Sequence, residues 1–502
     1  MKFLKAKAGK LLSGERFSSF ALAALIIAVV MVINALLYTA VDLFGLAFSY
    51  KQKLDYSLTG SHEEMFSDAI EAGKKVKISF CMAESDVAVH STGSEVYTTA
   101  RKFAEKYPDF IELDFINIIT RQDKDGNLIN LSKYKTDDTP IYKTSVIFEC
   151  GDNHRVVTDT YTGAGFASFF TLDSSMYVTS YNGEEVIASM VSWVTAEEHK
   201  TAYFTQRHGE QTEFSFTNLL TCAGYNIEVI DLREKSVPED ADLLIISNPT
   251  SDFEASMDGS VYTETDRLRA YLDRGGSLYV ALDPYVRTLS VLEGLLAEYG
   301  IAFSTSESAG GKKIRNIIKD PRNAITTDGF TLVAEYAESG LAKNISARVS
   351  KYGSGSVIVR DVCALSLSDG ALPLLVSSGS SVLEAGGKTV SDNGSYTIAA
   401  CSEKTTAEGK TSKIFVIPTV YLAVSDSLIA NGYSNKDFIY SLFEDFFGAE
   451  NMPYGCKPVL YSSQILENLT MGKARLYTFM ALVAPVAVFA FGTVVLVRRK
   501  YR

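Results

Sequence analysis

Residues 241–249 read ADLLIISNP, an almost unbroken apolar run that ends at an Asn-Pro pair. Such a run is typical of a strand that is buried on both faces, as in a parallel sheet covered by helices. Further β-like runs lie on either side of it, at 201–205 and 277–282, and residues 262–273 show a helical pattern. The strict alternation of strand and helix predicts a doubly wound parallel sheet.

A second α/β pattern lies upstream of this sheet. It contains three β-like runs and two helical ones, which predict a small α/β domain within residues 42–197. The expected elements are strand 76–80, helix 94–107, strand 111–118, strand 144–150 and helix 184–195.

The chain becomes rich in β-like runs after residue 300, with Gly/Ser-rich turns between them. We expect residues 198–300 to form the first part of a flavodoxin-like or glutamine-amidotransferase-like domain. Residues 301–472 would then hold a β-rich insertion and complete that domain. The order of these later strands stays open.

Two apolar stretches bracket the chain, at 17–41 and 473–497. Each exceeds the roughly 20 residues that a helix needs to cross a bilayer. Because the flanking tails, 1–16 and 498–502, are basic, both termini are expected to be cytoplasmic. The sequence therefore predicts a two-pass protein of the cell membrane with a large extracytoplasmic α/β domain, held by an uncleaved anchor rather than preceded by a signal peptide.

The charge balance excludes a nucleic-acid partner. The chain has 48 basic and 60 acidic residues, and the two tails hold nine of the basic residues and one acidic residue. The remainder carries 39 basic and 59 acidic residues, a net charge of −20. Such a surface repels phosphate backbones.

No metal or cofactor site is predicted. The six cysteines are far apart and form no CxxC pair, and their even number permits disulfides without indicating any. Two Gly-Lys-Thr triplets, 387–389 and 409–411, lack the glycine that a phosphate-binding loop has five positions earlier, since Val382 and Lys404 stand there.

Polar residues follow three of the predicted strands, and ligands of open α/β sheets bind beyond the carboxyl ends of strands. A ligand crevice could form there, although we favour an architectural role in which Gly209 permits a sharp turn and its neighbours bond across strand ends. The candidate residues are His208, Gly209, Glu210, Asn248, Asp252 and Asp283.

The order of these short motifs resembles the auxiliary-component family of gliding-motility-type ABC transporters. Its elements are a His-Gly-Glu turn, an apolar strand that ends in Asn-Pro and an acidic-aromatic step, and a Gly-Gly pair before a strand that ends in Asp-Pro. They stand here at 208–210, 241–253 and 275–284. The resemblance extends to residues 56–59 and 432–438, and so spans most of the chain.

The resemblance implies partners rather than a reaction. It makes the chain an extracytoplasmic auxiliary subunit that works with separate ATPase and permease chains, and the absence of a phosphate-binding loop agrees with this. Whether the chain also forms a homo-oligomer is left open.

Two other functions are weighed against this one. An envelope protein that binds a polysaccharide or peptide is the nearest rival, and a hydrolase-like enzyme using the strand-end crevice is the third. Catalysis is disfavoured because no Gly-x-Cys-x-Gly or Gly-x-Ser-x-Gly turn occurs at these strand ends and no HExxH is present. No catalytic residue is therefore assigned.

Overall fold

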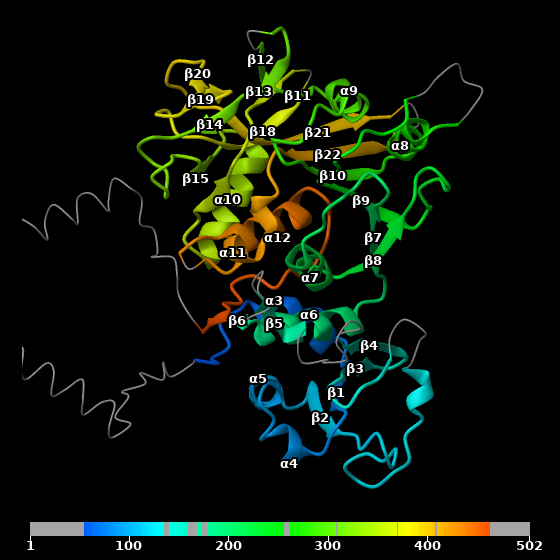
Figure 1. The fold of residues 1–502 in the computed structure, drawn as a ribbon. Coiled ribbons are helices and arrows are strands. Elements are labelled where there is room, and N and C mark those ends of the chain that lie inside the picture. The colour runs from blue at the N-terminus through cyan, green and yellow to red at the C-terminus, as the bar shows by residue number, and fades with distance from the viewer. Residues whose placement is uncertain are drawn as a thin grey trace, which may run out of the picture. The chain divides into compact units, whose positions relative to one another are not determined.

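The structure is a computed structural model of the 502-residue chain (Figure 1). The chain divides into two compact units between Asp55 and Tyr56, and all elements named below belong to the second unit. The structure describes residues 55–134, 140–158, 168–172, 178–255, 262–307, 310–368, 370–406, 409–430 and 432–461.

No helix within these ranges is long and apolar enough to cross a bilayer. The longest, α5 (Gly93–Lys106), has 14 residues, which at about 1.5 Å per residue falls well short of a hydrocarbon core about 30 Å thick. This finding contradicts the prediction of flanking transmembrane helices and, with it, the prediction of a two-pass protein of the cell membrane. The stretches 17–41 and 473–497 and the tails 1–16 and 498–502 lie outside the described residues.

A small mixed sheet contains β1 (Val76–Phe80), β2 (Ile111–Phe115), β3 (Val146–Cys150) and β4 (Asn153–Val157). The strand order is β2-β1-β3-β4, with β1 and β2 parallel and the other pairs antiparallel. Its helices are α3 (His62–Glu71), α4 (Glu84–Val87), α5 and α6 (Gly183–Thr195), and a short helical turn spans Leu131–Lys133.

Helix α6 joins this sheet to the rest of the unit. It packs on β1, β3 and β4 and also on α7 (Phe214–Cys222) (Figure 1). Twelve of its 13 residues are buried, including Glu184 and Glu185 in its first turn. One hydrophobic core runs from the small sheet through α6 to the large sheet, so the two α/β parts share a core.

The large sheet begins with five parallel strands in the order β8-β7-β9-β10-β22. Helices α7, α8 (Glu264–Asp273) and α9 (Ser290–Glu298) connect or follow them. The strands are β7 (Lys200–Thr205), β8 (Tyr225–Ile230), β9 (Ala241–Ser247), β10 (Ser277–Ala281) and β22 (Thr411–Ile417).

The other half of this 11-stranded sheet is antiparallel, which corrects the expected parallel sheet. The physical reason is the short link between β21 (Thr397–Thr405) and β22, because a parallel pair needs a crossover of a dozen or more residues. Beyond β21 come β18 (Leu372–Val376), β15 (Thr331–Tyr336) and β16 (Val357–Arg360), and β17 (Leu365–Leu367) with β11 (Ile301–Phe303) branches from β21.

The described part of the chain also contains three smaller sheets and three further helices. The sheets are β12 (Thr305–Glu307) with β13 (Lys313–Arg315); β14 (Ile317–Lys319) with β19 (Val382–Ala385) and β20 (Lys388–Thr389); and β5 (Phe170–Leu172) with β6 (Val178–Tyr181) and β23 (Val459–Leu460). The helices are α10 (Gly340–Tyr352), α11 (Ser425–Leu428) and α12 (Asn435–Asp445), and a helical turn spans Tyr421–Ala423. All six cysteines are free, and five of them are buried.

Candidate functional site

His208 lies just beyond the carboxyl end of β7 and is 3% exposed. Its Nδ1 is 3.1 Å from Oε1 of Glu210, and its Nε2 is 3.0 Å from Oε2 of Glu264. The ring of Phe253 stacks on the imidazole, with 4.0 Å between the centroids. Both ring nitrogens and one ring face are therefore occupied by the protein. We call His208, Glu210 and Glu264 the His208 latch.

Glu264 is the member of the latch that the sequence analysis does not single out. It is the first residue of α8, directly after the N-cap Thr263, which forms a capping box with Asp266. A carboxylate in a first turn also interacts favourably with the helix dipole. The Thr-x-x-Asp spacing could have located this helix start, but no local pattern connects it with His208.

Charge stabilises the latch. Burial disfavours the imidazolium, but the hydrogen bonds and charges of Glu210 and Glu264 outweigh it and raise the pKa of His208 above its usual value. Burial opposes ionisation of Glu210 as well, yet its bond to His208 and two backbone amides lower its pKa. The imidazole thus lacks a free nitrogen that could accept a proton from a substrate, as a general base must.

The loop after β9 clamps the turn that carries His208. The backbone amides of Thr250 and Ser251 donate to the carbonyl oxygen of His208, at 2.8 Å and 2.9 Å. Gly209 has a φ of +72°, and a Cβ on it would lie 2.1 Å from Oγ1 of Thr250. Only glycine fits this close approach without strain.

The remaining candidate residues form separate links. Oδ1 of Asn248 accepts from the backbone amide of Asp283 at 3.0 Å and so joins the ends of β9 and β10. The carboxylate of Asp252 accepts from the amides of Val291 and Leu292 at 2.9 Å and 3.2 Å and thereby holds the start of α9. The six predicted residues thus lie at strand ends, but as links between elements.

A second buried polar cluster joins the first and last described segments of the chain, and we call it the terminal junction (residues 59–62, 184 and 454–456). Oε1 of Glu184, in the first turn of α6, accepts from the backbone amides of Thr59 and Gly60, the latter at 2.7 Å. Its Oε2 accepts from Oγ1 of Thr59 at 3.0 Å. The amide of Ser61 donates to the carbonyl oxygen of Tyr454 at 3.1 Å.

The terminal junction contains His62, which is fully buried. Its Nε2 is 3.1 Å from Oε1 of Glu184 and 3.8 Å from Sγ of Cys456. The three donor atoms lie within 4.8 Å of one another, and zinc accepts ligands of these types. Because both Glu184 oxygens already accept hydrogen bonds from Thr59 and Gly60, we assign the cluster to holding the chain.

The segment 432–438 reaches the same junction. Nζ of Lys436 donates to the carbonyl oxygen of Cys456 at 2.7 Å and lies 3.0 Å from Oε1 of Glu185. Oδ1 of Asp437 accepts from the amide of Gly455 at 3.2 Å. Residues 56–59 and 432–438, both part of the family resemblance, therefore hold the same returning segment.

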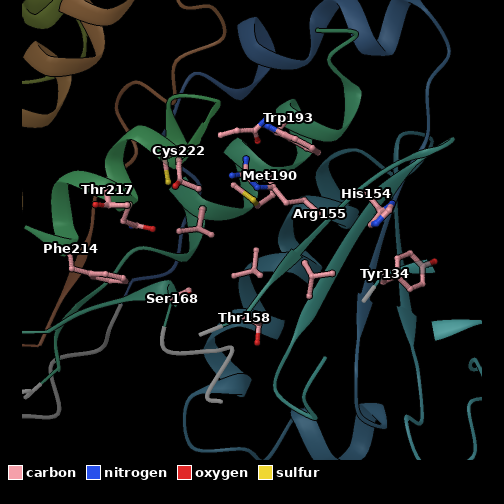
Figure 2. Close-up of a pocket in the computed structure, with 16 residues that line it drawn as sticks. Tyr134, His154, Arg155, Thr158, Ser168, Met190, Trp193, Phe214, Thr217 and Cys222 are labelled. Carbon is pink, nitrogen blue, oxygen red and sulfur yellow. The ribbon is translucent and has the colours of Figure 1, made fainter. Parts of the chain in front are cut away.

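A cavity of about 570 Å³, which the sequence did not predict, is lined mainly by residues of β4, α6 and α7. Figure 2 shows the side chains that line it. Arg155 of β4 lies beside Trp193 of α6, with 4.7 Å between Cζ and the centroid of the indole ring. Among the described lining residues there is no Asp or Glu. No sequence signal marked Arg155 as part of a site.

No model of a known protein family matches the chain, and no curated protein does. Solved structures with partial likeness include the mmIFT52 N-terminal domain (16% identity, TM-score 0.36, 49% of this chain and 96% of that one). PurLQS from Thermotoga maritima is another (11% identity, TM-score 0.25, 49% and 98%). Likenesses at this level establish neither the family nor the function of the chain.

Proposed function

We propose that this chain is a non-catalytic accessory subunit of an ABC-type transport system that acts with separate ATPase and permease chains. The proposal combines the family resemblance with one observation. Several residues that carry the resemblance, among them His208, Thr59 and Asp437, bond to other segments of the fold.

Such bonds occur both in the His208 latch and in the terminal junction. In the His208 latch, both imidazole nitrogens face carboxylates. In the terminal junction, Thr59 and Asp437 bond to the same returning segment through Gly455. Motifs with such partners preserve a shape, and a preserved shape is what a subunit needs to dock on other chains.

The test is affinity isolation of the tagged full-length chain at native expression, with quantitative mass spectrometry of the bound proteins. Recovery of an ATPase and a permease in fixed ratio, above a control with the tag alone, is the expected result. Their reproducible absence would refute the accessory role.

Catalysis is tested in parallel with the variant Glu264→Gln, which keeps the shape of the latch. For an accessory subunit, the variant recovers the same partners in proportion to the folded protein present. A hydrolytic activity of the purified chain that this variant abolishes would instead favour the enzyme reading.

A further inference from the structure

We propose that the cavity between β4, α6 and α7 binds a small organic oxyanion, a molecule with a carboxylate or phosphate group on an apolar body, and that Arg155 beside Trp193 holds the anionic group. The residues that line this site belong neither to the His208 latch nor to the terminal junction. It goes beyond the accessory role, which does not require it.

The first argument is the unpaired charge of Arg155. Two other arginines have carboxylate partners: Arg315 lies 2.6 Å from Glu293, and Arg348 lies 2.7 Å from Glu444. Within the described ranges, no carboxylate forms an ion pair with Arg155, whose Nη2 makes one long hydrogen bond of 3.4 Å to the carbonyl oxygen of Tyr225. Burial lowers the pKa of Arg155 to about 10, so the guanidinium stays charged at neutral pH.

The second argument is two unused donors. Nη1 of Arg155 and Nε1 of Trp193 are both buried, and neither has a hydrogen-bond partner in the part of the chain that the structure describes. Guanidinium and indole groups only donate, whereas an ionised carboxylate or phosphate accepts. Because both atoms have almost no accessible surface, an oxyanion would bond to them after a shift of the two side chains.

The stacking of Arg155 on Trp193 does not by itself compensate for burial. A cation–π contact is weaker than the cost of removing an ion from water. A bound counter-charge would close this difference. The described lining residues supply no such counter-charge, because none of them is acidic, and a bound anion would supply it.

The shape and chemistry of the cavity fit such a ligand. Its volume, about 570 Å³, is within the usual range for small-molecule sites. The side chains of Thr217, Asn218 and Thr221 on α7 offer hydroxyl and amide groups, and those of Val186 and Met190 on α6 offer apolar surface. One side can therefore bond polar atoms while the other packs against an apolar body.

The chain supplies its own reporter, since Trp193 is its only tryptophan. The full-length chain is titrated with phenyl phosphate and with hexanoate, and tryptophan emission and calorimetry are followed. The matched neutral probes are benzyl alcohol and hexanol. We expect saturable binding of the anions, at least tenfold tighter than that of their neutral partners.

Substitutions locate the site. Arg155→Met keeps the length of the side chain and removes its charge, and it should weaken anion binding at least tenfold while neutral probes are unaffected. Arg287→Met is the matched control, because Arg287 is exposed and does not line the cavity. It should bind like the wild type.

Three results would overturn the proposal: no saturable binding of either anion at millimolar concentration, equal affinity for neutral partners, or unchanged anion binding by Arg155→Met. If Arg155→Met does not fold, Thr217→Phe decides, because it narrows the cavity and leaves the guanidinium in place. Weaker anion binding by Thr217→Phe supports the site, and unchanged binding rejects it.

Discussion

Nε2 of His208 lies 3.0 Å from Oε2 of Glu264, although the two residues are 56 positions apart in the chain. One belongs to the turn after β7 and the other to the first turn of α8. With Glu210 on the second imidazole nitrogen, the contact ties a strand end to a helix start. The candidate crevice is therefore closed at His208 by the protein's own carboxylates.

Replacing His208 by leucine should lower the free energy of unfolding by about 3 kcal/mol, because it leaves buried carboxylates without their partner. The double variant His208→Leu/Glu264→Leu should cost less than the sum of the single changes, since it removes both charges. Urea denaturation of the three variants measures this coupling. Glu239→Gln, an exposed carboxylate, serves as the control, and strictly additive costs would rule out a coupled latch.

The latch should also make stability depend on pH. The folded pKa of His208 is raised above its ordinary 6.5, so its contribution is complete below that value and is lost as the pH rises through the raised pKa. The pKa of Glu210 is lowered from 4.5, so its contribution is lost as the pH falls through the lowered value.

The stability difference between the wild type and His208→Leu should therefore be largest between pH 4.5 and 6.5. It should shrink as the pH rises further. Urea midpoints for both proteins over a pH series test this. A difference that stays level or grows in alkaline solution would contradict the charged latch.

Gly209→Ala should destabilise the chain more than Gly73→Ala. Both glycines have positive φ, at +72° and +67°, but a Cβ at Gly209 would collide with Thr250, while nothing lies within 4 Å of one at Gly73. The backbone penalty of about 1 kcal/mol is common to both. Adding Thr250→Ala to Gly209→Ala should recover part of the additional loss of stability, as measured by thermal melting. Equal losses of stability at the two glycines would contradict the prediction, because they would show that Thr250 moves aside at little cost.

Glu184→Ala should loosen the segment that begins the second unit. The amides of Thr59 and Gly60 lose their acceptor, and hydrogen bonds to charged groups contribute about 1.5 to 3 kcal/mol. Amide hydrogen exchange at these two residues should accelerate about tenfold or more. Glu197→Ala, at an exposed carboxylate, should leave these rates unchanged. Unaltered exchange in Glu184→Ala would show that Glu184 does not hold this segment.

Local patterns were sufficient where neighbouring residues decide the conformation. The run 241–247 and the alternation around 76–80 are strands in the structure, and the helical pattern of 262–273 becomes α8. Periodicity reports the burial of a segment, and burial on both faces requires helices on both sides of a sheet. That is why the α/β character could be predicted without knowing which strands pair.

Local patterns gave wrong predictions where they were used to infer how distant segments are arranged. Alternating strands and helices suggested a parallel sheet throughout, but β21 and β22 meet through a short link and pair antiparallel. Apolar stretches suggested two flanking membrane helices, and no described helix has that character. A pattern of hydrophobicity describes a segment and leaves its partners undetermined.

The sequence by itself determined the acidic charge, the α/β character and the placing of the six candidate residues at strand ends. Only the tertiary structure decided what those residues do, because Glu264, a partner of His208, lies in α8 and Asp283, the partner of Asn248, lies just beyond β10. The pairing of Arg155 with Trp193, 38 positions away, depends on how β4 packs against α6. Such contacts arise from the packing of distant elements, which no local spacing encodes.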